Sequence, residues 1–154
     1  MTASPASGAA PQRRAGERSH GHCLLCGSDN PLSLKLQFTP VGADAVSGSF
    51  VCRDVLQGYE GMVHGGVIAA LLDSAMTHCL FHYGIEALTA DLRIRYRHPL
   101  SCRARAEISA RLVKITPPLY RLAAELKVGE TLIARAAGAF IDAARRPIPR
   151  AVSP

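Results

Sequence analysis

Apolar and polar residues alternate along most of this chain with a period of two. In the segment LSLKLQF, which begins at Leu32, the leucines and Phe38 fall on one face and the polar residues fall on the other. This pattern is typical of a strand with one buried face. The sequence predicts six such strands, at residues 32–38, 45–51, 88–99, 102–115, 119–128 and 131–142.

One long segment does not alternate. Residues 63–83 contain no proline, and their two glycines, Gly65 and Gly66, both lie near the start. We expect a helix here that ends at Gly84, because glycine favours the backbone conformation that follows a helix. The element order is then β-β-α-β-β-β-β, an α+β fold in which short turns make the sheet antiparallel. Since the helix is apolar on nearly all sides, we expect the sheet to wrap around it.

Chain length and composition fit one folded domain with polar ends. Of the 154 residues, 48% are hydrophobic and 19% are charged, which allows a substantial core. We predict a disordered basic arm at residues 1–20, a folded domain at 21–143 and a flexible tail at 144–154. No apolar run reaches the roughly 18 residues of a membrane span, and the start lacks a secretory signal. These features favour a soluble, cytoplasmic protein with no membrane partner; the arm also fits an organelle transit peptide.

The formal net charge of +6 is carried largely by the two ends of the chain and by one predicted strand. On that strand Arg93, Arg95 and Arg97 share a face, because they occupy every second position. Such a strip suits a small molecule that bears phosphates, a nucleic acid, or a solvated strand face. Aromatic residues make up only 5% and tryptophan is absent. Since no nucleic-acid-binding motif accompanies the strip, we predict no nucleic-acid partner.

The chain has five cysteines, and two of them lie in the stretch HGHCLLCG. His20, His22, Cys23 and Cys26 are residue types that bind zinc. A structural zinc site normally draws two ligands from each of two separated clusters, and no second cluster follows here. We therefore predict no metal, and a local turn with packed, reduced thiols; a zinc site is the alternative.

The start of the predicted helix joins a histidine to two glycines. Amides of the first helical turn have no partners within the helix, and the helix dipole adds positive charge there. Gly65 and Gly66 leave room for a ligand oxygen to approach these donors, as an oxyanion hole requires. The same glycines also suit a tight packing between a loop and the helix, and these residues alone do not separate the two interpretations.

Asp73 interrupts the apolar middle of the predicted helix. Burying an unpaired charge is costly, so a carboxylate in this place requires an explanation. Desolvation raises the pKa of a carboxyl group, and a raised pKa suits a general base that works near neutral pH. The alternative is a surface aspartate on a helix that is less buried than its composition indicates.

Asp73 and the glycine turn lie too far apart on one helix to serve one site. Asp73 is nine residues after His64, which corresponds to about 13 Å along a helix. A base must come within about 3 Å of the water that it activates. Two antiparallel helices from two copies of the chain bring the head of one beside the middle of the other. We therefore expect a homodimer with two shared sites, or a homotetramer built from two such dimers.

These residues resemble a known family. The stretch HGGVIAALLD, with CLLCGSDNPLSLKLQF, QGYEGMVHGG and TADLRIRYRHPL, is similar to the PaaI-like hotdog-fold acyl-CoA thioesterases. The resemblance covers residues 23–141 and implies an antiparallel sheet around one long helix, with the sheets of two subunits continuous across the dimer. It also implies hydrolysis of an acyl-CoA or aryl-CoA thioester without a cofactor.

The resemblance implies roles for individual residues. Asp73 matches the family's general base or nucleophile, and Thr89 matches a residue that helps to position the water. The backbone N–H of Gly65, from the other subunit, matches the group that polarises the thioester carbonyl. The arginines would hold the phosphates of coenzyme A. The expected substrate-binding residues are Gly58, Gly66, Met76, Arg93, Arg95 and Arg97.

One position departs from the family pattern. Some relatives have an asparagine six residues before the motif histidine, and this chain has Gly58 there. The neighbouring Gln57 completes the predicted catalytic set as a substitute donor, together with His64, which we expect to order the turn. Because of this departure, a non-catalytic acyl-CoA-binding protein is the main alternative to a thioesterase. A hydratase or dehydratase of the same fold fits less well, since no histidine and acid stand at the required spacing.

Overall fold

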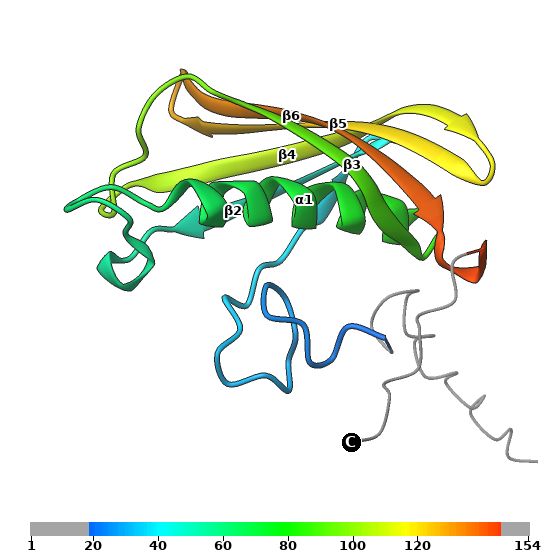
Figure 1. Ribbon diagram of the computed structural model, residues 1–154, viewed down its shortest axis with the longest axis horizontal. Helices are drawn as coiled ribbons and strands as arrows, with labels where there is room; N and C mark the ends of the chain where they lie inside the picture. Colours follow the sequence, from blue (N-terminus) through cyan, green and yellow to red (C-terminus); the bar gives the residue numbers. More distant parts are fainter. Residues whose placement is uncertain (1–18, 146–154) are drawn as a thin grey trace, which may run out of the picture.

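The computed structural model describes residues 19–145, which form one antiparallel sheet, one long helix and an irregular segment that precedes them (Figure 1). The helix α1 spans Gly65–His82, and two 3-10 helices are short: η1 (Asp54–Leu56) and η2 (Ala143–Arg145). This is the predicted architecture. The strands are β1 (Thr39–Val41), β2 (Ala45–Val51), β3 (Ala87–Tyr96), β4 (Arg105–Thr116), β5 (Leu119–Val128) and β6 (Thr131–Asp142).

The six strands form one sheet in the order β1-β2-β4-β5-β6-β3. Strands β4, β5 and β6 pair in sequence through short turns, and Gly129 takes a positive φ of +55° in the last of these. Strand β3 pairs with β6, with Leu92 opposite Gly138. Within residues 19–145, the outer side of β3 therefore has no strand beside it. Such an edge presents backbone groups that a further strand can bind.

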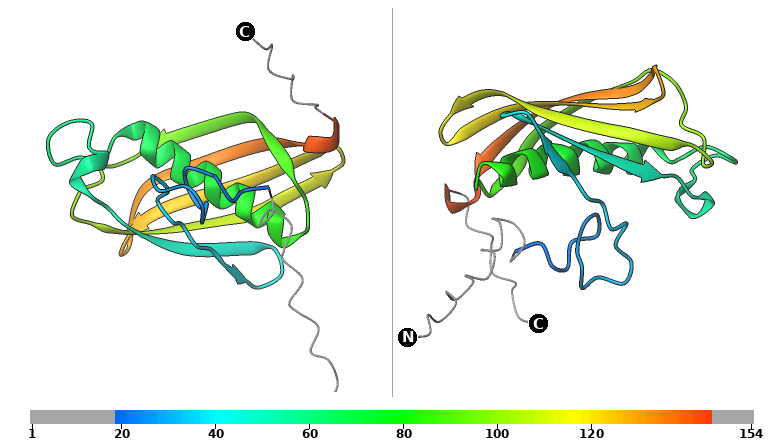
Figure 2. Two further views of the ribbon diagram at one scale, coloured as in Figure 1. Left: turned by 90° about the horizontal axis from the view of Figure 1, so that it is seen from below. Right: turned by 180° about the vertical axis from the view of Figure 1, so that it is seen from behind.

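Helix α1 lies along one face of the sheet (Figures 1 and 2). Leu72, Met76 and Leu80 are four residues apart and fully buried, which gives the helix an apolar stripe. The helix approaches β6 closely at Gly138, where a Cβ atom would lie 3.0 Å from Met76 Sδ. The helix ends before Gly84, whose φ of +71° only glycine adopts readily.

Most predicted elements appear close to their predicted bounds. Strands β2, β5 and β6 begin and end at the predicted residues. Helix α1 is shorter than the predicted 63–83 by two residues at its start and one at its end. Strands β3 and β4 are displaced from their predictions by three residues or fewer. Periodicity alone therefore predicts the helix and five of the six strands.

The predicted strand at residues 32–38 is wrong. Only Thr39–Val41 join the sheet, as β1. Lys35 takes a left-handed φ of +54°, which interrupts an extended backbone. Its Nζ donates hydrogen bonds to three carbonyl oxygens in residues 27–30. Of the four apolar side chains expected on one face, Leu36 is the one that is fully buried.

We call residues 19–38 the N-terminal loop. It lies against the side of α1 that faces away from the sheet (Figure 2). The ring of Phe38 lies 4.9 Å from that of His78, and the ring of His20 lies 4.8 Å from that of Phe81, measured between centroids. The sheet and this loop together account for a helix that is apolar nearly all round.

The predicted arm at 1–20 and the predicted tail at 144–154 lie largely outside the described residues and stay predictions. The structure describes only the inner ends of these two segments: Ser19 and His20 belong to the N-terminal loop, and residues 144–145 belong to η2. None of the helices within residues 19–145 combines the length and the apolarity that crossing a bilayer requires.

Candidate active site

Asp73 lies half-buried in the middle of α1 and is hydrogen-bonded to β3. The Thr89 hydroxyl Oγ1 donates to Asp73 Oδ1 over 2.8 Å. The register of β3 against β6 shifts between Thr89 and Asp91, so Ala90 is left out of the pairing. Such a bulge redirects side chains locally. The structure therefore brings together the two residues that the family resemblance implies act on the water.

The environment of Asp73 raises the pKa of its carboxyl group. Burial is the larger cause, because it disfavours the charged form, and the Thr89 hydrogen bond opposes it by stabilising the carboxylate. The group is thus a stronger base than an exposed aspartate. Its contact with Thr89 also fixes one carboxylate oxygen and leaves the other without a hydrogen-bond partner among residues 19–145.

His64 caps the N-terminus of α1, which we call the helix head. This residue has an extended ψ of 135° at the N-cap, and its Nδ1 accepts a hydrogen bond from the Gly66 N–H over 2.9 Å. The carbonyl of Gly65 accepts from the Tyr96 hydroxyl over 2.8 Å. The Gly65 N–H has no acceptor among residues 19–145. One strong donor with the helix dipole behind it is therefore available at this turn.

A pocket of about 510 Å³ opens at this helix head. Its position beside a free amide and a helix N-terminus suits an oxygen that carries or gains negative charge. Its walls are mainly apolar and aromatic, with basic and imidazole groups from the chain that follows β3. The lining residues are Gly58, Tyr59, Met62, Val63, His64, Gly65, Ile68, Tyr96, Arg97, His98, Pro99 and Leu100.

Gln57 and Gly58 form part of the loop that leads to the helix. The Gln57 side-chain oxygen accepts a hydrogen bond from the Gly61 N–H over 3.1 Å, which holds the side chain within its own loop. Gly58 lines the pocket, and a Cβ atom there would lie 3.1 Å from His64 Cδ2. The glycine thus lets this loop pack closely on the imidazole that orders the turn.

One protomer does not bring both halves of the predicted site together. Neither Asp73 nor Thr89 lines the pocket at the helix head. Asp73 follows Gly65 by eight residues in a continuous helix, which corresponds to about 12 Å. The structure therefore contains a base with its partner in one place and a free amide with a pocket in another.

The three predicted substrate-binding arginines do not share one surface. Arg93 and Arg95 border a groove of about 600 Å³ on the sheet, together with Arg111 and Arg135. Arg97 lines the pocket at the helix head instead. The amides of Arg97 and the next residue both donate to one carbonyl, that of Ile133, and this interrupts the alternation of the strand. Strand β3 ends at Tyr96, so the predicted strip extends along this strand only as far as Arg95.

Two further residues differ from their predicted places. Met76, expected to contact substrate, has no exposed surface and packs against β6 in the core. Tyr96, which was not predicted, lines the pocket and holds the helix head through its hydroxyl. The available signal was its position in RIRYRHP, where it alternates with the arginines and so points to the other face of the strand.

Comparisons with known proteins agree with this fold. Residues 60–133 match the family model described as the thioesterase superfamily. Acyl-coenzyme A thioesterase THEM4 of Rattus norvegicus is 40% identical over 60 residues, which cover 39% of this chain and 26% of that protein. The matched part therefore spans about a quarter of the length of this curated relative.

Two solved structures are similar over most of the described domain. Protein RHA08564, a thioesterase superfamily protein, superposes with a TM-score of 0.75 at 22% identity, over 88% of this chain and 72% of that chain. A single-site mutant of the phenylacetic acid degradation protein PaaI from Thermus thermophilus superposes with a TM-score of 0.65 at 25% identity, over 71% and 94% of the two chains. Residues 60–133 of this chain are therefore similar to the thioesterase superfamily, and the domain has the hotdog fold of these thioesterase structures.

Proposed function

We propose that this protein hydrolyses the thioester of an acyl-CoA or aryl-CoA. Water activated by Asp73 of one copy attacks a carbonyl that is held at the helix head of another copy. The observation that carries this proposal is the half-buried Asp73, hydrogen-bonded to Thr89 beside an open sheet edge. The name of the curated relative, an acyl-coenzyme A thioesterase, supports the substrate class.

The open edge of β3 supports the dimer. Two copies of β3 that pair about a two-fold axis make the two sheets continuous and satisfy the backbone groups of both edges. Thr89 lies on this strand, and Asp73 lies directly behind it on α1. In such a pair the helices run antiparallel, so Asp73 of one copy approaches the Gly65 turn of the other.

The reaction needs two proton transfers, one from the water to Asp73 and one from Asp73 to the departing thiolate. Asp73 takes a proton from the water, and the resulting hydroxide attacks the thioester carbonyl carbon. Charge develops on the carbonyl oxygen, where the Gly65 N–H and the helix dipole stabilise it. The C–S bond then breaks, and the protonated Asp73 returns its proton to the departing thiolate, so no metal or cofactor is needed. Thr89 orients the carboxylate throughout.

Arginine side chains provide a place for the phosphates of coenzyme A. Arg97 is one of the residues that line the pocket at the helix head. Arg93 and Arg95 lie on the strand that would form the dimer edge. Guanidinium groups bind phosphate through paired, charge-assisted hydrogen bonds. The acyl group would then enter the pocket beside Tyr96 and Met62.

A non-catalytic acyl-CoA-binding protein is the second candidate. It is favoured by Gly58, which offers no amide side chain to the thioester, and by Gln57, whose oxygen is bound to the Gly61 N–H. Such a protein would bind CoA esters and release no thiol from any of them.

The first test is loss of thioester absorbance over a panel of acyl-CoA and aryl-CoA esters. We expect Asp73→Asn to lower kcat by about 10²–10⁴-fold, the usual contribution of a general base. Glu107→Gln, an exposed carboxylate on β4, is the matched control and should keep the wild-type rate. Ester binding without turnover by the wild-type protein would support the second candidate.

A mixed dimer tests whether the site is shared. Gly65→Pro removes the proposed oxyanion donor, and proline suits this first helical position because His64 before it already has an extended ψ of 135°. Gly65→Ala keeps the N–H, and its Cβ would make only ordinary contacts, 3.6 Å from the Tyr96 hydroxyl. We expect the proline variant to lose about 10²–10³-fold in kcat and the alanine variant to stay active.

Differently tagged Asp73→Asn and Gly65→Pro chains are then co-expressed, and the particle that carries both tags is purified. A shared site predicts one intact site per mixed dimer, and thus about half of the wild-type rate. Sites that lie within one chain predict that the mixed particle is as inactive as either variant alone, and this result would overturn the proposal.

The pH dependence identifies the base. Asp73 must be ionised to accept a proton, so kcat/KM falls as the pH drops through its pKa. Because burial raises this pKa, the midpoint should lie above the ordinary aspartate value of 3.8. Thr89→Val removes the hydrogen bond that lowers the pKa and should move the midpoint further up. A midpoint that is unchanged in this variant would exclude Asp73 as the titrating group.

A further inference from the structure

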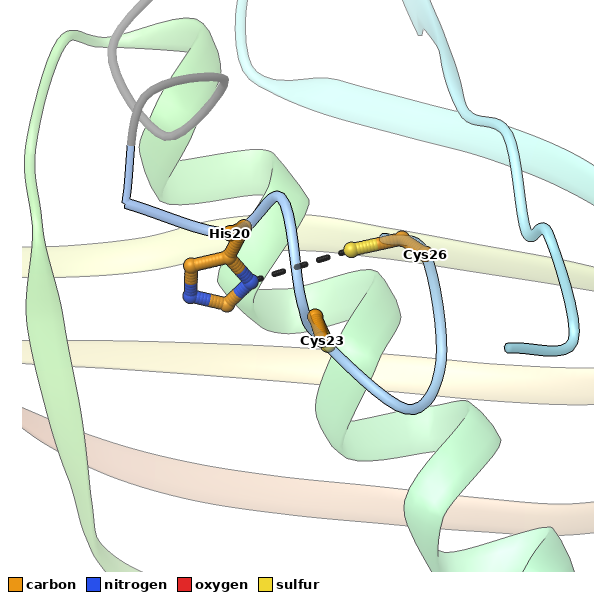
Figure 3. A group of neighbouring side chains, drawn as sticks. All are labelled: His20, Cys23 and Cys26. Atoms are coloured by element: carbon orange, nitrogen blue, oxygen red, sulfur yellow. Dashed lines mark hydrogen bonds between the residues drawn. The ribbon is translucent and has the colours of Figure 1, made fainter. Parts of the chain in front are cut away.

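The N-terminal loop brings together three side chains that the proposed reaction does not use. The Nδ1 or Nε2 atom of His20 and the Sγ atoms of Cys23 and Cys26 all lie within 4.8 Å of one another. The three side chains are half-buried. Figure 3 shows them on one turn of the loop, which lies over α1. Imidazole and thiolate groups are the usual protein ligands of zinc.

The spacing of these atoms fits a tetrahedral metal ion. Zinc binds sulfur at about 2.3 Å and imidazole nitrogen at about 2.0 Å, so neighbouring ligand atoms of a tetrahedron are about 3.5–3.8 Å apart. Cys26 Sγ lies 3.7 Å from His20 Nδ1, which points toward it (Figure 3). All three ligand atoms lie within 4.8 Å of one another, so the group must contract by about 1 Å or less to hold one ion.

The backbone of the turn is fixed in a way that orients the sulfur atoms. The Cys23 N–H donates to the His20 carbonyl over 3.0 Å, and the Gly27 N–H donates to the Cys23 carbonyl over 2.9 Å. The Leu25 N–H donates to Cys23 Sγ over 3.4 Å. A backbone amide that points at a sulfur atom stabilises negative charge there, as a metal-bound thiolate requires. Gly27 is buried, and a Cβ at this position would collide with the backbone of Cys23.

We propose that His20, Cys23 and Cys26 bind one zinc ion. Each thiol releases a proton to solvent as its sulfur binds the metal, and the imidazole binds in its neutral form. Two thiolates and one Zn²⁺ give a neutral centre, which suits a half-buried place better than two separate charges. The fourth position is taken by a water molecule, since three is the number of protein ligands within reach among residues 19–145.

The zinc ion would fasten the N-terminal loop to α1. The His20 ring packs edge-to-face on Phe81, so a metal that fixes this ring also fixes its contact with the helix. The loop has no helix or strand before residue 39 to hold its shape. The cluster lies beside the last turn of α1, where Phe81 follows Asp73 by eight residues, about 12 Å along the helix, and Gly65 by sixteen, about 24 Å. The ion would therefore stand apart from the proposed hydrolysis, and its role would be to hold the loop on the helix.

The test measures metal in the full-length protein, which is purified with a reductant, incubated with zinc and dialysed. We expect one zinc per chain, and a loss of at least tenfold in bound zinc for Cys23→Ser and for Cys26→Ser. His22→Gln changes an exposed neighbour outside the cluster and should keep its zinc. Removal of the metal by a chelator should lower Tm in the wild type and leave Tm unchanged in the serine variants.

Cobalt substitution keeps the test valid if a serine variant fails to fold. The wild-type protein with one equivalent of Co²⁺ should show thiolate-to-metal charge-transfer bands and the visible bands of tetrahedral cobalt. A zinc content below one tenth per chain, with Cys23 and Cys26 both reacting freely with a thiol reagent in the folded protein, would overturn the proposal. So would a disulfide between Cys23 and Cys26 that persists under reductant, or cobalt bands that survive in the folded Cys23→Ser variant.

Discussion

Helix α1 is covered on one side by the sheet and on the other by the N-terminal loop, and the two covers are held by different means. The sheet is held by continuous backbone ladders and by a stripe of fully buried apolar side chains on the helix, among them Leu72 and Met76. The loop is held by single residues, such as Lys35, Gly27 and the His20 cluster. Stability is therefore spread over many residues on one side and concentrated in a few on the other.

The same substitution on the two sides gives the largest contrast. Leu72→Ala should lower the free energy of unfolding by about 2–5 kcal/mol, because the leucine is fully buried beneath the sheet. Leu32→Ala, in the loop, should change it by less than about 0.5 kcal/mol, because that side chain is 77% exposed. Urea unfolding of both variants measures the difference. Equal losses would mean that the loop contributes to the core as the sheet does.

Gly48 on β2 lies where the two covers meet. A Cβ atom there would collide with the Gln37 carbonyl oxygen and lie 2.9 Å from Phe38 Cδ1. We expect Gly48→Ala to cost about 1–3 kcal/mol, because either the loop or the strand must shift. Val51→Ala, an exposed position on the same strand, is the control. Faster hydrogen exchange confined to the loop and β1 would show that the loop moves; a uniform change across the sheet would contradict this.

Lys35 holds the loop through three charge-assisted hydrogen bonds to carbonyl oxygens, at 2.7–3.1 Å. Lys35→Met keeps the length of the side chain and removes these bonds, so we expect the free energy of local opening of the loop to fall by about 1–2 kcal/mol. Proteolysis within the loop should become faster than in the wild type. The urea concentration at which the sheet unfolds should stay nearly the same as in the wild type. Lys114→Met is the control for the loss of a positive charge, because Lys114 is an exposed residue on β4. Equal proteolysis rates in the two variants would show that Lys35 does not hold the loop.

His78 gives the smallest expected effect. Its buried Nε2 has no hydrogen-bond partner among residues 19–145, so His78→Leu should be neutral or stabilising by up to about 1 kcal/mol at pH 7. Burial, reinforced by the charge of His20, lowers the pKa of His78 to about 4 from 6.5. The unfolded chain therefore takes up a proton first, and wild-type stability declines as the pH falls from 6.5 toward 4. Thermal unfolding of the leucine variant should show a smaller decline over this range; an identical decline would contradict the assignment.

The sequence predicted the regular part of the domain well because helices and strands are encoded by neighbouring residues. Strand β5 buries every second side chain from Tyr120 to Leu126, and both β5 and β6 appear at their predicted bounds. The predicted strand at residues 32–38 failed because its conformation depends on contacts that the alternating pattern does not encode. Its alternation is genuine, but Lys35 binds carbonyl oxygens of the preceding turn, and this contact turns the backbone out of the extended conformation.

The candidate site was predictable to the extent that its residues carry a local signal. A carboxylate inside an apolar helix and two glycines at its start stand out in any sequence. Tyr96 was missed and Met76 was placed in the wrong environment. The sequence does not show whether an apolar side chain on a strand or helix faces a pocket or the core until its contacts are known. The separation of Arg97 from Arg93 and Arg95 depends on one shared carbonyl acceptor, which the sequence does not reveal.

The order of residues was enough to predict one helix on an antiparallel sheet and the distance that separates Asp73 from the glycine turn, since both follow from backbone geometry. Three features emerge only in the folded domain: Thr89 reaches Asp73, β3 is left as an edge, and His20 meets two cysteines. The difference arises because the period of a helix or strand depends on neighbours in the chain. Which side chains meet across a bulge, an edge or a turn depends on the packing of the whole domain.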